Sequence, residues 1–316
     1  MNTRRSAVVM GFVVGLLNAA VYADDGMTLK YKFAKGDKLI YRSKMEMKQS
    51  QTIMGMALEN EMSHDGISSF TVEAVDEKGN AQLTVKGERL KSKAQFAALG
   101  EYAFDSTSTE RDKSSTIGAA MVPLMERISG ITYQATVPPD GGVFAVKGYA
   151  DQLRDLIESN PLTAQFAGGG TDDSARQALD GIFPKVGKAM AKPGDTWDVP
   201  IEIVMGKVGT LTGKSTFRFV GPDKVGDRAT AKLEVTTDLS VELNIDMDGT
   251  KVTGKITTKN ANGIVQFDIV AGRVISGQST VSMGGALNVN VNGMDIPVQN
   301  DQTTKTSVEY LEKLPD

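Results

Sequence analysis

Long runs of alternating side chains constrain this chain more than any other feature. In 241–247, Val, Leu, Ile and Met occupy every second position, and Glu, Asn and Asp lie between them. The runs 38–48 and 287–292 alternate in the same way, with Ile40 as the exception in the first. Because successive side chains of a strand point to opposite faces, each run predicts a strand with one apolar and one polar face. Such strands are typical of antiparallel sheets.

Turn signals connect these runs. Asn292-Gly293 and Asp248-Gly249 each join two alternating runs, which is a strong signal for a two-residue hairpin. A longer hairpin loop is predicted at 76–80, with Gly79 in the left-handed conformation. Pro297 lies on the outward face of its run, and this position predicts an edge strand or a bulge.

The two β-rich parts of the chain contain matching segments. Gly36-Asp37-Lys38-Leu39 opens the first part, and Gly194-Asp195-Thr196-Trp197 opens the second. Further along, Ser69–Val72 matches Thr216–Phe219. We interpret the two parts as related β-meanders. The alternative is that the ordinary residue preferences of turns and strands produce the match.

Between the two meanders the pattern changes to helical spacing. Residues 150–158 and 172–183 place apolar residues three and four positions apart, and 115–129 predicts a further short helix that Pro123 interrupts. Gly168-Gly169-Gly170 is a flexible break between the first two. We therefore predict a mostly helical insert between two blocks of strands.

The predicted organisation places a first β-meander at 24–110, the mostly helical insert at 111–190 and a second β-meander at 191–316. We expect residues 24–316 to form one compact domain of mainly β (α+β) class. Its centre would be a large curved antiparallel sheet or barrel, with the helical insert packed on the concave face or mouth. Two packed β domains are the alternative.

The N-terminus predicts export from the cytoplasm. Arg4 and Arg5 precede an apolar stretch at 7–20, and Val21-Tyr22-Ala23 supplies small residues where a signal peptidase cleaves, so we expect cleavage after Ala23. The apolar stretch is too short to cross a hydrocarbon core of about 30 Å, so we expect no integral membrane segment after the signal is removed. The mature protein would be extracytoplasmic, either periplasmic or secreted.

Composition excludes several function classes. The chain has no cysteine, so it can form no disulfide and carry no lipid on an N-terminal cysteine. Losing Arg4 and Arg5 changes the formal net charge from −4 to −6, and an acidic surface argues against a nucleic-acid partner. His64 is the only histidine, expected at a hairpin end, which leaves zinc without enough ligands and predicts no catalytic residue.

Two segments resemble known loops but lack an essential part. Asn244–Gly249 has the acidic spacing of a calcium loop, but Lys255 stands where a bidentate glutamate is needed. Gly209–Ser215 has three residues between its glycines where a phosphate loop has four, and a strand pattern follows where a helix is needed. We therefore predict no metal site and no cofactor.

Methionine is unusually frequent, with 15 residues in the chain. Met45 and Met47 lie on one expected strand, and Met54, Met56 and Met62 lie on the next, where we expect them to face one side. Flexible core filling and an adaptable lining for an apolar ligand are two interpretations. A copper(I) site of thioethers is a third, and the alternation of these residues within strands argues against it.

Trp197 is the single tryptophan and lies in register with Val199, Ile201 and Ile203. An aromatic residue at the start of a buried strand is usually a core anchor, and contact with a ligand is the alternative. With the five methionines, Trp197 completes the predicted apolar lining of a ligand site.

The paired segments Gly36–Leu39 and Gly194–Trp197, the segment Thr136–Gly148 and the segment Gly263–Gly272 carry a resemblance to a known family. They look like a family of secreted β-rich bacterial proteins of unknown function that is common in planctomycetes. The resemblance covers nearly all of the mature chain and implies no catalytic residues. A looser, architectural likeness is to periplasmic lipoprotein carriers, whose curved antiparallel sheet wraps helices around an apolar cavity.

The sequence therefore predicts a non-catalytic extracytoplasmic protein that binds a lipid or another apolar ligand. A structural or interaction module of the cell envelope is the alternative, and it predicts a packed core with a flat patch in place of a cavity. A carboxylate-based hydrolase is a further alternative, because 39 acidic residues bring some pair together in any fold. It predicts a cleft with two acids, one of which has a raised pKa.

Overall fold

A computed structural model describes residues 26–160, 162–163, 170–204, 209–247, 250–291 and 293–315. The expected signal segment 1–23, Asp248-Gly249 and Asn292 lie outside these residues.

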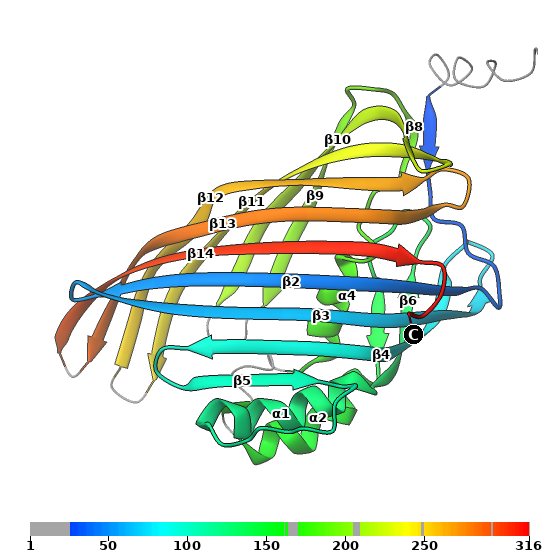
Figure 1. Cartoon of the computed structure of the whole chain (residues 1–316). Coiled ribbons are helices and arrows are strands. Elements are labelled where there is room, and N and C mark those ends of the chain that lie inside the picture. The colour runs from blue at the N-terminus through cyan, green and yellow to red at the C-terminus, as the bar shows by residue number, and fades with distance from the viewer. Residues whose placement is uncertain are drawn as a thin grey trace, which may run out of the picture.

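One antiparallel sheet of twelve strands dominates the described part of the chain (Figure 1). Its order is β7-β6-β4-β3-β2-β14-β13-β12-β11-β10-β9, and β5 pairs with β4. The strands of this sheet are β2 (Lys38–Ile53), β3 (Met56–Val75), β4 (Ala81–Phe96), β5 (Gly100–Asp105), β6 (Thr132–Val137), β7 (Ala145–Lys147), β9 (Thr196–Val204), β10 (Thr210–Val225), β11 (Arg228–Met247), β12 (Thr250–Asp268), β13 (Arg273–Val291) and β14 (Met294–Leu311). A separate pair consists of β1 (Met27–Leu29) and β8 (Lys188–Ala191).

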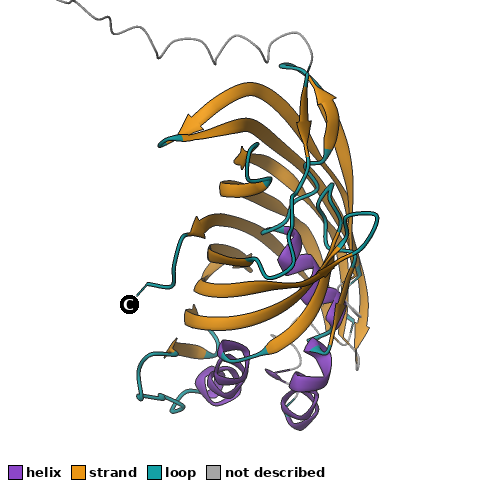
Figure 2. Cartoon of the chain, turned by 90° about the vertical axis from the view of Figure 1, so that its right-hand side faces the viewer, coloured by secondary structure: helices purple, strands orange, loops and turns teal. Residues whose placement is uncertain are grey.

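The two meanders meet in the middle of this sheet. The last strand, β14, pairs with β2 from Val298–Ile53 to Leu311–Ile40, so strands from both ends of the chain share one ladder. Among the described residues the outermost strands, β7 and β9, do not pair with each other. The sheet is strongly curved but open (Figure 2), which confirms the predicted mainly β class and selects a curved sheet over a closed barrel.

The insert packs inside the curve and along its lower edge (Figure 2). Its described helices are α1 (Thr116–Ser129), α2 (Tyr149–Ser159) and α4 (Asp172–Asp180). The insert also contributes β6, β7 and most of β8, so it is less helical than predicted. The expected interruption at Pro123 is wrong, because α1 continues through that residue. None of the described helices has the length and apolar character needed to cross a membrane.

Phe183, just after α4, anchors the insert to the sheet. Its side chain is fully buried, and its ring meets the rings of Phe70 and Tyr41 at centroid distances of 5.1 and 5.8 Å. Tyr31 and Phe33, which precede β2, pack on the same ring from 6.0 and 6.4 Å. Four aromatic neighbours in edge-on geometry make this cluster the centre of the core. We call the face of the sheet that carries Tyr41 and Phe70 the inner face, and the opposite one the outer face.

The matching segments found in the sequence form the same turn twice. Gly36-Asp37 and Gly194-Asp195 have glycine φ angles of 91° and 94°, a region that favours glycine. In both turns the aspartate carboxylate accepts a backbone N–H three residues earlier at 3.0 Å. In both, the aspartate carbonyl accepts the N–H of the matched strand residue, Val72 or Phe219, at 2.9 Å. The two segments therefore form the same turn at the start of each meander, a geometry that ordinary turn preferences also produce.

Pro297 does not mark an edge strand, because β14 lies between β13 and β2. Pro297 is opposite Asn288 of β13, and the pairing with β2 begins one residue later, at Val298–Ile53. Pro297 therefore lies just beyond the end of β2, so its missing N–H removes no hydrogen bond to that strand.

Truncating Phe183 should destabilise the whole protein. Phe183→Ala removes the ring from a fully packed site, so we expect a loss of about 3–5 kcal/mol in the free energy of unfolding, measured with urea. Phe144→Ala is the matched control, because Phe144 is 80% exposed, and we expect a change within about 0.5 kcal/mol. A loss of less than about 1 kcal/mol for Phe183→Ala would show that the aromatic cluster is not central.

Candidate functional site

A cleft of about 630 Å³ lies between the inner face of β9 and β10 and the insert. Its floor consists of Val199, Ile201 and Ile203 of β9 and Phe217 of β10. The three β9 residues alternate along the strand, so the same period that forms the sheet places their side chains in one row. Because β9 is an outermost strand, this row lies at the open side of the curved sheet.

The opposite wall is the 138–144 segment, which links β6 to β7. Gly141 has φ 81°, and a Cβ there would lie 2.2 Å from the carbonyl oxygen of Pro184 and 2.6 Å from the Tyr31 ring. Only glycine allows so close an approach. The N–H of Gly142 donates to the carbonyl of Phe183 at 2.8 Å, which fastens this wall to the aromatic cluster. The segment then presents Phe144, whose side chain is 80% exposed, at the rim.

The charged groups of the wall are paired with one another. Asp180, at the end of α4, accepts the N–H of Val143 at 2.6 Å and the Arg176 guanidinium at 3.1 Å. The Arg176 guanidinium also donates to Asp173 at 2.7 Å. Burial of Asp180 raises the pKa of its carboxyl group, since desolvation disfavours the charged form. The four floor side chains carry no charge, so the cleft has an apolar row beside a polar wall, with Glu202 of β9 also in its lining.

Two further acids, Asp140 and Glu202, also line this cleft, which makes acid–base catalysis the alternative. A raised pKa on one acid in a cleft is the signature expected of a carboxylate hydrolase. However, each oxygen of Asp180 already has a partner: the Val143 N–H, which connects α4 to the neighbouring loop, and Arg176, one turn earlier in the same helix. This geometry gives Asp180 a structural role. No group of three His, Asp or Glu side chains in the described residues could hold a metal ion.

Three of the predicted methionines lie together on the inner face. Met47 is opposite Met62 in the β2–β3 ladder, and Met45 is opposite His64. All four side chains are half-buried, and Met62 packs against the cluster beneath α1. None of the three methionines lines the cleft. His64 lies in the middle of β3 and not at a hairpin end as predicted, and its burial lowers its pKa.

The other predicted lining residues lie elsewhere. Met54 occupies the turn between β2 and β3 with φ 51°, so it does not share a strand face with Met62. Met54 and Met56 are 70% and 66% exposed. Trp197 stacks on Phe217 at 5.7 Å, and Phe217 forms part of the cleft floor. The indole N–H of Trp197 is buried and has no hydrogen-bond partner among the described residues.

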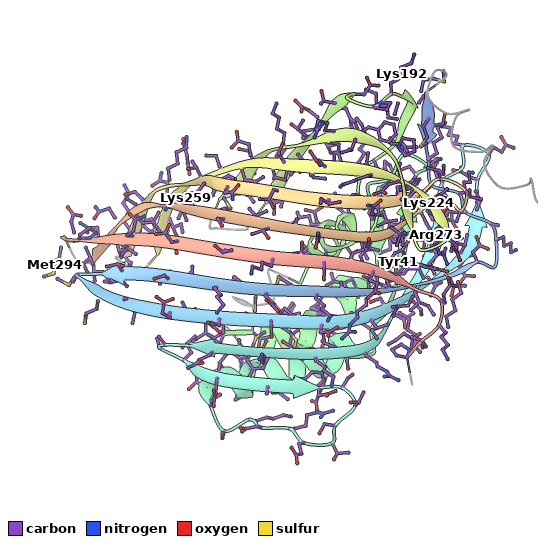
Figure 3. All side chains as sticks on the ribbon, turned by 45° about the horizontal axis from the view of Figure 1, so that its top comes forward. Tyr41, Lys192, Lys224, Lys259, Arg273 and Met294 are labelled. Carbon is purple, nitrogen blue, oxygen red and sulfur yellow. The ribbon has the colours of Figure 1, made fainter. Side chains whose placement is uncertain are left out.

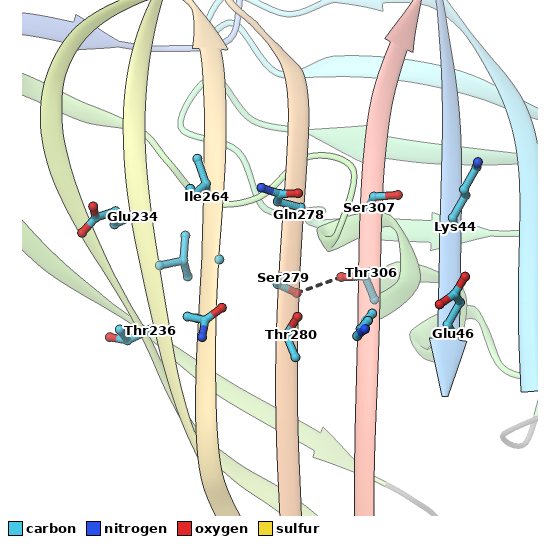
Figure 4. A pocket seen from close by; sticks show the side chains of 14 residues that line it. Lys44, Glu46, Glu234, Thr236, Ile264, Gln278, Ser279, Thr280, Thr306 and Ser307 are labelled. Atoms are coloured by element: carbon cyan, nitrogen blue, oxygen red, sulfur yellow. Dashed lines mark hydrogen bonds between the residues drawn. The ribbon is translucent and has the colours of Figure 1, made fainter. Parts of the chain in front are cut away.

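A second depression, of about 650 Å³, crosses the outer face of the sheet from β11 to β2 (Figure 4). Its lining is mostly polar: Gln278, Thr280 and Ser307 lie between Glu234 on one side and Lys44 and Glu46 on the other. Ile264 is its one large apolar side chain on this face. Ser279 and Thr306 are bonded at 2.8 Å in the same region. This depression lies on the solvent face of the sheet, whereas the inner cleft lies between the sheet and the insert.

Sequence reasoning missed the cleft wall, although the signal for the floor was present. The alternation that places Trp197 in register with Val199, Ile201 and Ile203 identifies the floor. No local pattern shows that Phe144 and Asp180 lie opposite it.

Comparison with protein-family models and with curated proteins finds no match. Among solved structures, lipovitellin, in a study of lipid–protein interactions, has a TM-score of 0.40 and 11% identity over 90% of this chain. The chain spans only 26% of that lipovitellin chain. An outer membrane channel from Pseudomonas putida F1 has a TM-score of 0.24 and 8% identity, covering 91% of this chain and 98% of that one. A DUF1329 family protein from Desulfovibrio piger has a TM-score of 0.15 and 10% identity, covering 87% and 88%. These likenesses are too distant to indicate a function.

Ionisation of the Asp180 carboxyl group should make the free energy of unfolding depend on pH. Because its pKa is raised in the folded state, its contribution to stability is largest below the unfolded value near 3.9 and is lost as pH rises through the folded value. Asp180→Asn keeps an acceptor for the Val143 N–H and has no charge. Its free energy of unfolding, relative to the wild type, should therefore rise between about pH 4 and pH 7 in urea titrations.

Asp180→Ala is the control for the hydrogen bond. It leaves the Val143 N–H without an acceptor, so we expect a loss of about 1–3 kcal/mol at both pH values. A relative stability of Asp180→Asn that falls with rising pH would contradict the raised pKa.

Proposed function

We propose that this protein is a non-catalytic binding protein that holds an apolar ligand, such as the acyl chain of a lipid, in the cleft between β9–β10 and α4. The observation that carries the proposal is the uncharged row of Val199, Ile201, Ile203 and Phe217 facing a wall whose charges are already paired. A volume of about 630 Å³ falls in the range of small-molecule sites, which are mostly apolar with a few polar groups.

The aromatic residues around the cleft fit this role. Phe144 is 80% exposed at the rim, where a large apolar side chain has a cost in water unless a partner covers it. Trp197 stacks behind Phe217, so its ring responds to a change in the position of the floor. The half-buried pairs Met45–His64 and Met47–Met62 extend the adaptable inner face beyond the cleft.

The same proposal places the protein outside the cytoplasm. It rests on Arg4 and Arg5, the apolar stretch 7–20 and the expected cleavage after Ala23, together with the absence of cysteine. We also propose that the chain is related to the secreted β-rich bacterial proteins that its sequence resembles. An extracytoplasmic carrier or receptor for a lipid needs no reactive centre, and Asp180, the acid with the raised pKa in this cleft, is bonded to the Val143 N–H and to Arg176.

A lipid analogue should quench Trp197 on binding. The protein has one tryptophan, so energy transfer to cis-parinaric acid reports this region alone. We expect a saturable loss of Trp197 emission with the wild type. Ile201→Asp places a charge on the cleft floor and should weaken the apparent affinity by about tenfold or more, equivalent to about 1.4 kcal/mol.

Ile264→Asp is the matched control, because Ile264 is a half-buried isoleucine on the outer face. It should bind as the wild type does, and far-ultraviolet circular dichroism should confirm that both variants are folded. Equal weakening by the two variants, or no saturable quenching of the wild type, would contradict a ligand site in the cleft.

A further inference from the structure

Exposed apolar side chains gather at one end of the sheet, far from the cleft. Met54 and Met56 lie at the turn between β2 and β3 and are 70% and 66% exposed. Met294 and Val291 lie at the turn between β13 and β14 and are 64% and 36% exposed. These four residues account for half of the large hydrophobic side chains that are exposed in the described chain. We call them the methionine tip.

The two turns lie at the same end of the sheet, and the β13–β14 turn extends four residues beyond the end of β2. β2 pairs with β14, and Val298 lies opposite Ile53, so the neighbouring strands bring both turns to the same edge. Figure 3 places Met294 at the far end of the sheet from Tyr41 and Arg273, at a projecting point of the molecule. The aromatic core lies at the Tyr41 end, so the methionine tip belongs to no part of it.

The tip is also depleted of charge. Residues 49–58 contain no charged side chain, and residues 286–298 contain only Asp295. At the chain average of 23% charged residues, these two segments together would carry about five. The carboxylate of Asp295 accepts hydrogen bonds from the amides of Asn288 and Asn290 at 2.9 and 2.7 Å. Both turns are therefore apolar with amide groups just behind them, while the neighbouring strand β12 places Lys251 opposite Asn290.

The turn between β2 and β3 is a tight hairpin that exposes Met54. Met54 and Gly55 have φ angles of 51° and 82°, which is the two-residue hairpin geometry that Asn-Gly or Gly-Gly adopts most readily. The left-handed region is unfavourable for a residue as large as methionine. In this turn the Met54 side chain is 70% exposed.

We propose that the methionine tip is a membrane-docking surface that inserts shallowly between the lipids of an uncharged bilayer. Three methionines about two-thirds exposed offer on the order of a few hundred Å² of surface, below the roughly 800 Å² per partner of a stable protein interface. Narrow projecting turns can enter a lipid surface without a complementary pocket, and flexible thioethers adapt to irregular lipid packing. The absence of Lys and Arg from both segments predicts binding that depends little on lipid charge or salt.

Single-cysteine labelling tests this proposal directly, because the chain has no cysteine of its own. The chain is prepared without residues 1–23, whose apolar stretch would bind vesicles by itself. Met54→Cys and Met294→Cys are each labelled with the polarity-sensitive dye NBD and mixed with phosphatidylcholine vesicles. We expect a blue shift and about a twofold or larger rise in emission at both sites.

Met190→Cys is the matched control, since Met190 is also a left-handed methionine, with φ 55°, and is 58% exposed. It lies in β8, two residues from Lys192, which Figure 3 places at the opposite end of the molecule from Met294. Its label should not respond to vesicles. An equal response at Met190, or none at Met54 and Met294, would overturn the proposal.

Vesicle flotation supplies a second measurement on unlabelled protein. The triple variant Met54→Gln, Met56→Gln and Met294→Gln keeps side-chain size and adds polarity, and its binding should fall about fivefold or more. Met190→Gln with Val270→Gln, at exposed sites elsewhere, should leave binding unchanged. Wild-type binding should persist in about 0.5 M NaCl.

Three results would contradict docking through apolar insertion. Binding only to anionic vesicles and loss of binding in salt would indicate an electrostatic surface. Undiminished binding by the triple variant would place the contact elsewhere. A dimer that the triple variant abolishes, without vesicle binding by the wild type, would make a second copy of the chain the partner.

Discussion

The packing of Phe183 against the inner face of the sheet is the contact on which the rest of the structure depends. Its ring joins the segment after α4 to Tyr41 and Phe70 in the first meander. Its carbonyl receives the N–H of Gly142, so the same residue also holds the loop between β6 and β7. One residue therefore connects the insert, the cleft wall and the sheet.

This anchoring explains why a cleft forms where it does. The insert covers the inner face at the aromatic end, whereas β9, as an outermost strand, has an apolar row that reaches the open side of the curve. The 138–144 wall can come no closer to the apolar row of β9, because Gly141 is already in close contact with Pro184. The remaining space has the uncharged β9–β10 side chains on one side and the Asp180–Arg176 pair on the other, with Glu202 also in its lining.

The sequence predicts local structure well and long-range contacts poorly. Alternation in 38–48 correctly places Met45 and Met47 on one face, because a period of two is a local property of the chain. Asp180 and Phe144 line the wall opposite β9, and no local spacing shows that these distant segments face each other. The sequence pattern predicts Met54 on a strand with Met56, whereas Met54 lies in the turn with φ 51°, next to Gly55.

The most direct test of the ligand site is photo-crosslinking with a diazirine-labelled fatty acid, followed by mass-spectrometric mapping of the modified peptides. The account predicts labelling of the peptides that contain Val199–Ile203, residues 138–144 and residues 176–185, and predicts that excess unlabelled oleate prevents it. Labelling confined to the outer face around Ile264, or spread evenly over the chain without competition by oleate, would contradict a binding site between β9 and α4.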